Sequence, residues 1–164
     1  MDFLTESGLE IDRGVVVDRQ MQTSVSDIYA AGDLIQFIDQ ADGREAVSAL
    51  WSNAVHTGRV AGCNMSGGRS LMPPLLSVMN STEIAGLPLI SAGFLDDPEE
   101  RYTTFAEAHG ENYRRLLFDQ DRLVGMLFIG RVDRAGVYTN LIRQRISLGS
   151  RRDALVREVM EAMR

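Results

Sequence analysis

The sequence predicts an α+β protein built from two parts, and three observations support this. Two short apolar runs, residues 15–17 and 28–31, precede a long stretch with helical spacing of apolar residues. After two adjacent prolines, several apolar runs are separated by polar turn residues, which is typical of an antiparallel sheet. Two further segments with helical spacing follow. We therefore expect a boundary near the proline pair, with residues 1–70 and 71–164 as the two parts.

The first part combines two predicted strands with one helix. Residues 15–17 are three valines, and residues 28–31 form an apolar run that ends at the Gly-Asp pair 32–33, so both are expected as buried strands. Between residues 44 and 65, apolar and small side chains recur every three or four positions. This spacing predicts a helix that packs closely along one face. The Gly-Gly pair at 67–68 is a helix stop signal.

The second part begins with segments of strand composition. Residues 77–94 and 102–108 have the composition of extended chain. Residues 112–118 and 123–129 flank the polar segment 119–122, which indicates a β-hairpin. An antiparallel sheet accommodates all of these segments with short connections.

Two helices are predicted near the end of the chain. Apolar residues at helical spacing mark residues 137–146 and 155–163. Ser150 and Asp153 form an imperfect capping box for the last helix, because the third position usually carries Glu or Gln.

Composition and charge exclude several classes of function. The 164 residues contain 17 basic side chains, all arginine, and 23 acidic ones, for a net charge of −6. Without lysine, a Schiff-base lysine and the usual phosphate-binding P-loop are excluded. An acidic chain is a poor partner for nucleic acid or anionic lipid. The longest nearly unbroken apolar run is eight residues, and the first residues lack the features of a secretion signal. A cytoplasmic protein with no nucleic-acid or membrane partner is expected.

Self-contained catalytic motifs are missing from the sequence. No two of the 15 glycines are two positions apart, so there is no GxGxxG. His56 and His109 lack HExxH spacing, no serine lies in a GxSxG motif, and Cys63 is the single cysteine. We therefore predict no catalytic residue and no metal site in this chain, and we expect Cys63 to be a small buried side chain.

One segment carries a specific resemblance. Residues 23–33, Thr-Ser-Val-Ser-Asp-Ile-Tyr-Ala-Ala-Gly-Asp, resemble the second flavin-binding motif of the FAD-dependent pyridine nucleotide-disulfide oxidoreductase family, whose members include rubredoxin-reductase-like, nitrite-reductase-large-subunit-like and NADH oxidase-like enzymes. Residues 58–65, Gly-Arg-Val-Ala-Gly-Cys-Asn-Met, are similar to a second family pattern. A more diffuse similarity reaches residue 149 and looks like the family's C-terminal α+β domain.

The resemblance implies a fold and a domain assignment. Residues 1–70 would be a remnant of the FAD-binding α/β domain, namely its C-terminal portion, and residues 71–164 would be the small C-terminal domain of antiparallel sheet with helices. The likeness covers only about the last third of a family enzyme. The strand at residues 15–17 would then be separated from its sheet, with unpaired edge groups that favour a homo-oligomer.

The resemblance also implies site residues. Asp33 would bind a ribityl hydroxyl of FAD, with Gly32 allowing close approach. The backbone amides of Leu50 and Trp51, at the start of the following helix, would face the flavin pyrimidine ring, and the Trp51 ring would lie beside the isoalloxazine. Two plainer roles compete with these: Asp33 as a cap of the next turn, and Trp51 as a core residue.

The function implied by the resemblance is that of a flavoprotein oxidoreductase that transfers electrons from NAD(P)H through FAD to an acceptor. The chain alone is expected to be inactive and not to retain FAD, because much of the FAD site would come from other sequence. The alternatives are a non-enzymatic module for dimerisation or partner docking, and a small ligand-binding domain with a cleft between its halves. The acceptor and the choice between NADH and NADPH stay open.

Overall fold

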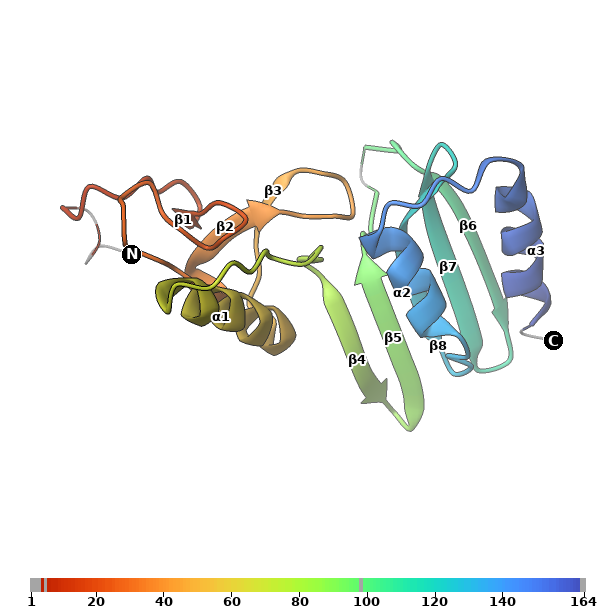
Figure 1. Cartoon of the computed structure of the whole chain (residues 1–164). Helices are drawn as coiled ribbons and strands as arrows, with labels where there is room; N and C mark the ends of the chain where they lie inside the picture. The colour runs from red at the N-terminus through yellow and green to blue at the C-terminus, as the bar shows by residue number, and fades with distance from the viewer. Residues whose placement is uncertain (1–3, 5, 98, 163–164) are drawn as a thin grey trace. The chain divides into compact units, whose positions relative to one another are not determined.

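The computed structural model describes the chain except residues 1–3, 5, 98, 163 and 164, and it contains two compact units (Figure 1). The first unit comprises Met1–Asp39 and Gly43–Ser77, and the second comprises Gln40–Asp42 and Val78–Arg164. Each unit has its own sheet and helices. The α+β class predicted from the sequence is confirmed.

The first unit is built on a small mixed sheet. Strand β1 (Val15–Val16) pairs in parallel with β2 (Ile35–Ile38), which pairs antiparallel with β3 (Glu45–Val47). Val15 lies opposite Ile35, and both side chains are buried. Strand β1 also has a neighbour on its second side, because Ile11 forms a bridge with Val15. The expected unpaired strand at residues 15–17 is therefore wrong.

The predicted strand at residues 28–31 is also wrong. Within that segment the structure has a single isolated bridge, between Gln22 and Tyr29, and Ile28 is 42% exposed. The buried position belongs instead to Met21, whose carbonyl accepts a hydrogen bond from the backbone N–H of Ala30. Among the described residues the run pairs only through this bridge, so its apolar composition alone does not produce a strand.

Helix α1 (Trp51–Met65) covers the core of the first unit. It begins seven residues after the predicted start, because Glu45–Val47 pair with β2 as strand β3. Val60 and Ala61 pack with Met21 and Ile35 in the core cluster. The same helix leaves Cys63 exposed, so the expectation of a buried cysteine is wrong.

The second unit contains a five-stranded antiparallel sheet, as the sequence predicted. Its strand order is β4-β5-β8-β7-β6, with the bounds Met79–Ile84 (β4), Leu87–Gly93 (β5), Thr103–His109 (β6), Asn112–Asp119 (β7) and Arg122–Ile129 (β8). The predicted segment 77–94 divides at Ala85 and Gly86, both with positive φ. Two such residues in a two-residue connection suit the twist of a hairpin.

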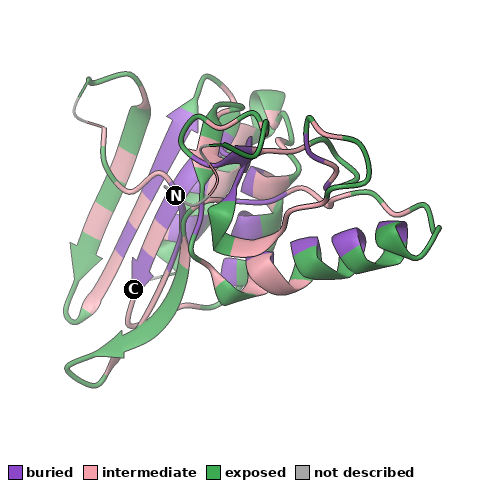
Figure 2. Ribbon diagram, turned by 90° about the vertical axis from the view of Figure 1, so that its left-hand side faces the viewer, coloured by how far each residue is buried: buried purple, intermediate pink, exposed green. Residues whose placement is uncertain are grey.

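Two helices accompany this sheet. Helix α2 (Ala135–Arg143) contacts β8 and β5, and α3 (Arg152–Glu161) contacts β6 and β7. The central strands are mostly buried, whereas the edge strands β4 and β6 are exposed along most of their length (Figure 2). The core of this unit therefore lies over the middle of the sheet. Residue 163, the end of the predicted last helix, is outside the described residues.

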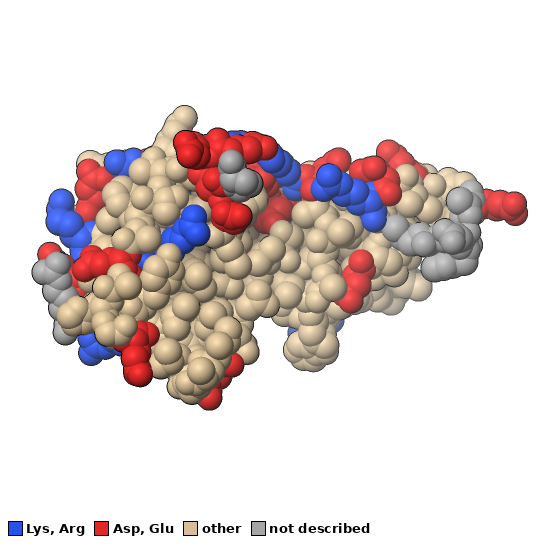
Figure 3. Space-filling model, turned by 180° about the vertical axis from the view of Figure 1, so that it is seen from behind, with Lys and Arg blue, Asp and Glu red and all other residues tan. Residues whose placement is uncertain are grey.

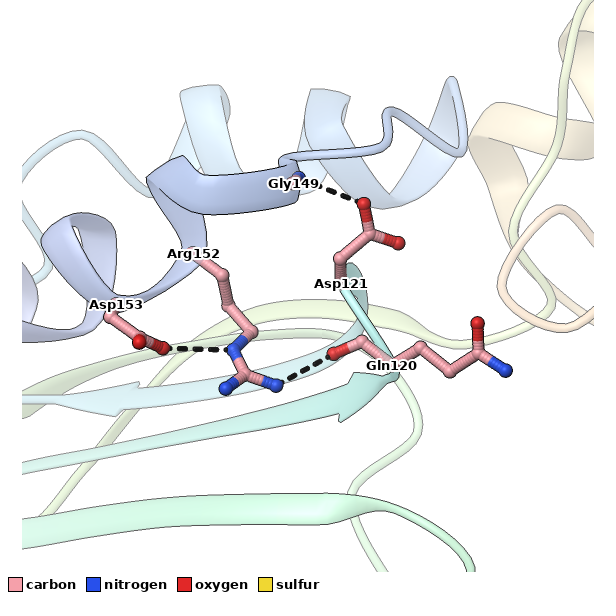
Figure 4. Close-up of polar contacts among 5 residues, drawn as sticks. All are labelled: Gln120, Asp121, Gly149, Arg152 and Asp153. Atoms are coloured by element: carbon pink, nitrogen blue, oxygen red, sulfur yellow. Dashed lines mark hydrogen bonds and ion pairs between the residues drawn. The ribbon is translucent and has the colours of Figure 1, made fainter.

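The start of α3 differs from the prediction. Residues Gly149–Arg151 form a 3-10 turn, and no side chain caps α3, so the proposed Ser150–Asp153 capping box is wrong. Asp153 instead accepts a hydrogen bond from Nε of Arg152 (Figure 4). The turn between β7 and β8 holds the 3-10 turn before α3 in place. The Asp121 carboxylate of that hairpin accepts a hydrogen bond from the N–H of Gly149, at 2.8 Å.

Candidate functional site

The Gly32–Asp33 turn is the first component of the candidate site. Gly32 has φ +82°, a left-handed conformation that favours glycine, and it opens a 3-10 turn, Gly32–Leu34 (η2). Asp33 is exposed, and its carboxylate forms no hydrogen bond or ion pair within the described part of the chain. The alternative role of Asp33 as a capping residue is therefore wrong. An exposed carboxylate without a protein partner can accept hydrogen bonds from a ligand.

The amino end of α1 is the second component. Leu50, the N-cap, has extended backbone angles, no side chain caps the helix, and the first turn contains no acidic residue. The first amides of a helix have no partner within the helix, and they carry its positive dipole end. Trp51, the first residue of the helix, is 82% exposed, so the alternative of a core tryptophan is wrong. This end of α1 can stabilise negative charge.

Thr57 connects the two components. Its Oγ1 accepts a hydrogen bond from the N–H of Gly32, at 3.0 Å, and donates one to the carbonyl of Asn53, at 2.8 Å. Because Thr57 is six residues after Trp51, the Gly32 turn lies about 9 Å along the helix axis from the start of α1. A ligand that contacted both components would have to be extended.

Sequence reasoning did not identify Thr57. It is 1% exposed and lies on the buried stripe of α1 with Asn53 and Asn64. A buried hydroxyl needs hydrogen-bond partners. The sequence feature that could have identified Thr57 is a polar side chain at a buried position of the helical repeat, one helical turn after Asn53.

Asn53 and Asn64 secure α1 to other segments of the first unit. The Asn53 side-chain amide donates a hydrogen bond to the carbonyl of Leu76, at 2.8 Å. The Asn64 amide donates to the carbonyls of Gln20 and Ser70, and its Oδ1 accepts from the N–H of Ser70. These bonds hold the helix that carries the candidate site at both of its ends.

Other functional elements were sought across the described residues. Among them, no three His, Cys, Asp or Glu side chains gather in a way that could hold a metal ion. The helices in this part of the chain are also too short or too polar to cross a bilayer. Basic and acidic side chains are interspersed on the face shown in Figure 3.

Two family models match the chain. The model of the pyridine nucleotide-disulphide oxidoreductases matches residues 1–58, which include Gly32, Asp33, Leu50 and Trp51. The model of the rubredoxin NAD+ reductase C-terminal domain matches residues 79–146, which cover the five strands of the second unit and α2.

Individual relatives agree with these matches. The epsilon subunit of an NADH-dependent phenylglyoxylate dehydrogenase from Aromatoleum evansii is 30% identical over 159 residues, which are 95% of this chain and 38% of that protein. An NADH-rubredoxin oxidoreductase from Clostridium acetobutylicum is 26% identical over 80% of this chain and 33% of the relative. The chain thus spans between a third and two fifths of the length of these relatives.

Solved structures share the fold. The NADH:rubredoxin oxidoreductase of C. acetobutylicum superposes with a TM-score of 0.69 at 24% identity, covering 90% of this chain and 37% of that one. An NAD-dependent persulfide reductase from A. fulgidus superposes with a TM-score of 0.74 at 21% identity, covering 91% and 31%. Fold and sequence both resemble part of the length of these proteins. The chain is similar to pyridine nucleotide-disulphide oxidoreductases over both of its units.

Proposed function

We propose that this chain supplies part of the FAD site and the C-terminal domain of a flavoprotein oxidoreductase that transfers electrons from NAD(P)H to an acceptor. One observation carries the proposal: the free carboxylate of Asp33 follows a left-handed Gly32 and is linked through Thr57 to a helix with an uncapped amino end. All of these residues lie in the segment matched by the family model.

The residues present fit FAD. A solved relative from Desulfovibrio vulgaris is described as an FAD-dependent pyridine nucleotide-disulphide oxidoreductase. In this chain, Asp33 would accept hydrogen bonds from a ribityl hydroxyl, and Gly32 would leave room for the ligand beside the backbone. The amides of Leu50 and Trp51 would lie at the pyrimidine edge, where the dipole of α1 stabilises negative charge by about 0.3–2 kcal/mol. Bound FAD supplies the electron-accepting chemistry, and the chain's own groups bind and orient it.

The remaining assignments belong to the same proposal. Residues 1–70 are the C-terminal portion of the FAD-binding domain, and residues 71–164 are the C-terminal domain. The partners are NAD(P)H and an electron acceptor, and the protein is a cytoplasmic homo-oligomer. Because the chain spans a minor part of its relatives, we also propose that it neither retains FAD nor turns over NAD(P)H by itself.

Asp33→Ala in the complete flavoprotein tests the proposal, with Asp12→Ala as the matched control. Asp12 is another exposed acid of the first unit that forms no side-chain hydrogen bond with the described residues. Removal of one charged hydrogen-bond acceptor should weaken FAD binding about 10- to 100-fold. Flavin absorbance and equilibrium dialysis measure the binding, and circular dichroism checks the fold.

The outcomes separate the candidate functions. Loss of FAD from the Asp33 variant, with an intact fold and a normal Asp12 control, supports the oxidoreductase. Normal flavin content in both variants would refute the site and favour the docking module. For the chain as it stands, a purified sample with stoichiometric bound flavin and NADH oxidation would contradict its proposed inactivity.

A further inference from the structure

A cleft lies in the second unit, and none of its lining residues belongs to the proposed FAD site. Its volume is about 250 Å³, and its lining comes from β7, from the start of α2 and from α3 with the residue that follows it. The lining residues are Arg114, Asp133, Arg134, Tyr138, Glu158 and Ala162. This volume is slightly below the usual range for small-molecule sites, so the cleft suits a ligand of a few heavy atoms.

Arg114 is the most buried residue of the cleft. Its side chain is 1% exposed, and its guanidinium stacks over the ring of Phe128, at 4.7 Å from the ring centroid. Nη1 donates a hydrogen bond to the carbonyl of Val159, and Nη2 donates one to that of Arg131. Nε is buried and has no hydrogen-bond partner. A buried N–H without a partner is unfavourable, and no carboxylate of the described chain forms an ion pair with this buried guanidinium.

Tyr138 adds a hydrogen-bond donor. The residue is 3% exposed, and its ring meets that of Phe128 edge to face. Its hydroxyl makes no hydrogen bond with the rest of the described chain, although the residue lines the cleft. Burial raises the pKa of Tyr138, and Glu158 raises it further, whereas Arg114 and Arg134 lower it. The net increase keeps the phenol protonated, so it can donate a hydrogen bond at neutral pH.

The charges around the cleft define the ligand further. Arg134 forms an ion pair with Glu158, and Asp133 is a second acid of the exposed rim. Arg131 adds positive charge nearby, since its Nη1 donates to the carbonyl of Ala162, at 2.9 Å. The positive dipole end of α2 lies at the same rim. One buried positive charge with two acids at the rim favours a singly charged anion over a multiply charged one.

We propose that this cleft binds a small monocarboxylate, which accepts a hydrogen bond from the hydroxyl of Tyr138 and offsets the buried positive charge of Arg114. Arg114 and Tyr138 line the cleft and are almost fully buried, whereas Arg134 is exposed. The proposal depends only on residues of the second unit, so it stands or fails independently of the FAD site.

Titration of the full chain with sodium acetate tests the proposal. Sodium chloride at matched ionic strength is the reference, and amide chemical shifts of α2 and α3 are the readout. The wild type should show saturable shifts with a millimolar Kd, and phosphate should bind more weakly because of the two rim acids. Tyr138→Phe removes only the hydroxyl and should weaken acetate binding about tenfold. Tyr113→Phe is the matched control, because Tyr113 is a tyrosine of the same unit that has intermediate exposure and does not line the cleft.

Substitutions of two arginines test the contribution of positive charge to binding. Arg114→Met keeps an apolar stem on Phe128 but removes the buried positive charge, and it should abolish saturation if it folds. Arg134→Gln leaves the buried groups in place and should weaken binding even if Arg114→Met is unfolded. Shifts in the wild type that do not saturate, or equal acetate binding by Tyr138→Phe and Tyr113→Phe, would overturn the proposal.

Discussion

Substitution of Gly125 by alanine should strongly destabilise the second unit. Gly125 lies opposite Gly93 where β8 meets the end of β5. A Cβ at Gly125 would lie 1.9 Å from the carbonyl oxygen of Phe94. A carbon and a carbonyl oxygen normally approach to about 3.3 Å, so the strands would have to separate by more than about 1 Å. No side-chain rotation can relieve this contact, because the oxygen belongs to the backbone.

The expected magnitude follows from two costs. Overpacking of a well-packed site costs about 1–3 kcal/mol or more. The shift also weakens the hydrogen bond from the N–H of Phe94 to the carbonyl of Val124, now 3.0 Å long, at a cost of about 1 kcal/mol. We therefore expect Gly125→Ala to lower the free energy of unfolding by about 3 kcal/mol, which corresponds to a fall in Tm of about 6–12 °C for a chain of this size.

Gly136→Ala is the matched control. Gly136 lies in α2, and a Cβ there would meet no atom within 4 Å. Alanine is the better helix former, so this change should stabilise the unit by up to about 1 kcal/mol. Urea unfolding followed by far-ultraviolet circular dichroism measures both variants, and hydrogen exchange of peptides from β5 and β8 localises the effect. The reasoning is refuted if Gly125→Ala matches the wild type, or if Gly136→Ala is equally damaging.

Two further predictions concern polar contacts. Asn64→Leu should lower the free energy of unfolding of the first unit by about 2–4 kcal/mol, since it removes three hydrogen bonds and leaves the Ser70 N–H without its acceptor; an unchanged urea midpoint would contradict this. Hydrogen bonds from the Ser147 hydroxyl and the Gly149 N–H hold the pKa of Asp121 below its ordinary value. The ionised Asp121 carboxylate therefore stabilises the folded state. This stabilisation is complete above a pH of about 4 and is lost as the pH falls through the lower pKa of the folded state. Ser147→Ala should raise the pKa of Asp121, as carboxyl-carbon NMR titration would show, and an unchanged titration would contradict the assignment.

The strands of the second unit were largely predictable from the sequence. The hairpin of β7 and β8 appears where apolar runs flank the polar residues 119–122, because alternation and turn chemistry are local properties. The short strands of the first unit were not predictable in the same way. Glu45–Val47 is a three-residue strand that exists only through pairing with β2, and residues 28–31 have strand composition without a partner along their length. A strand needs a neighbour, which composition does not specify.

The candidate site shows the same division. The sequence by itself determined that Gly32 and Asp33 end a family-like motif, and that a helix follows with Trp51 near its start. Only the tertiary structure decided that the Asp33 carboxylate has no partner within the described chain, that Thr57 joins Gly32 to α1, and that Arg114 is buried under α3. Motif and helical period depend on neighbours along the chain. The contacts of Thr57 and Arg114 join residues 25 and 45 positions apart, and these form only when packing brings distant segments together.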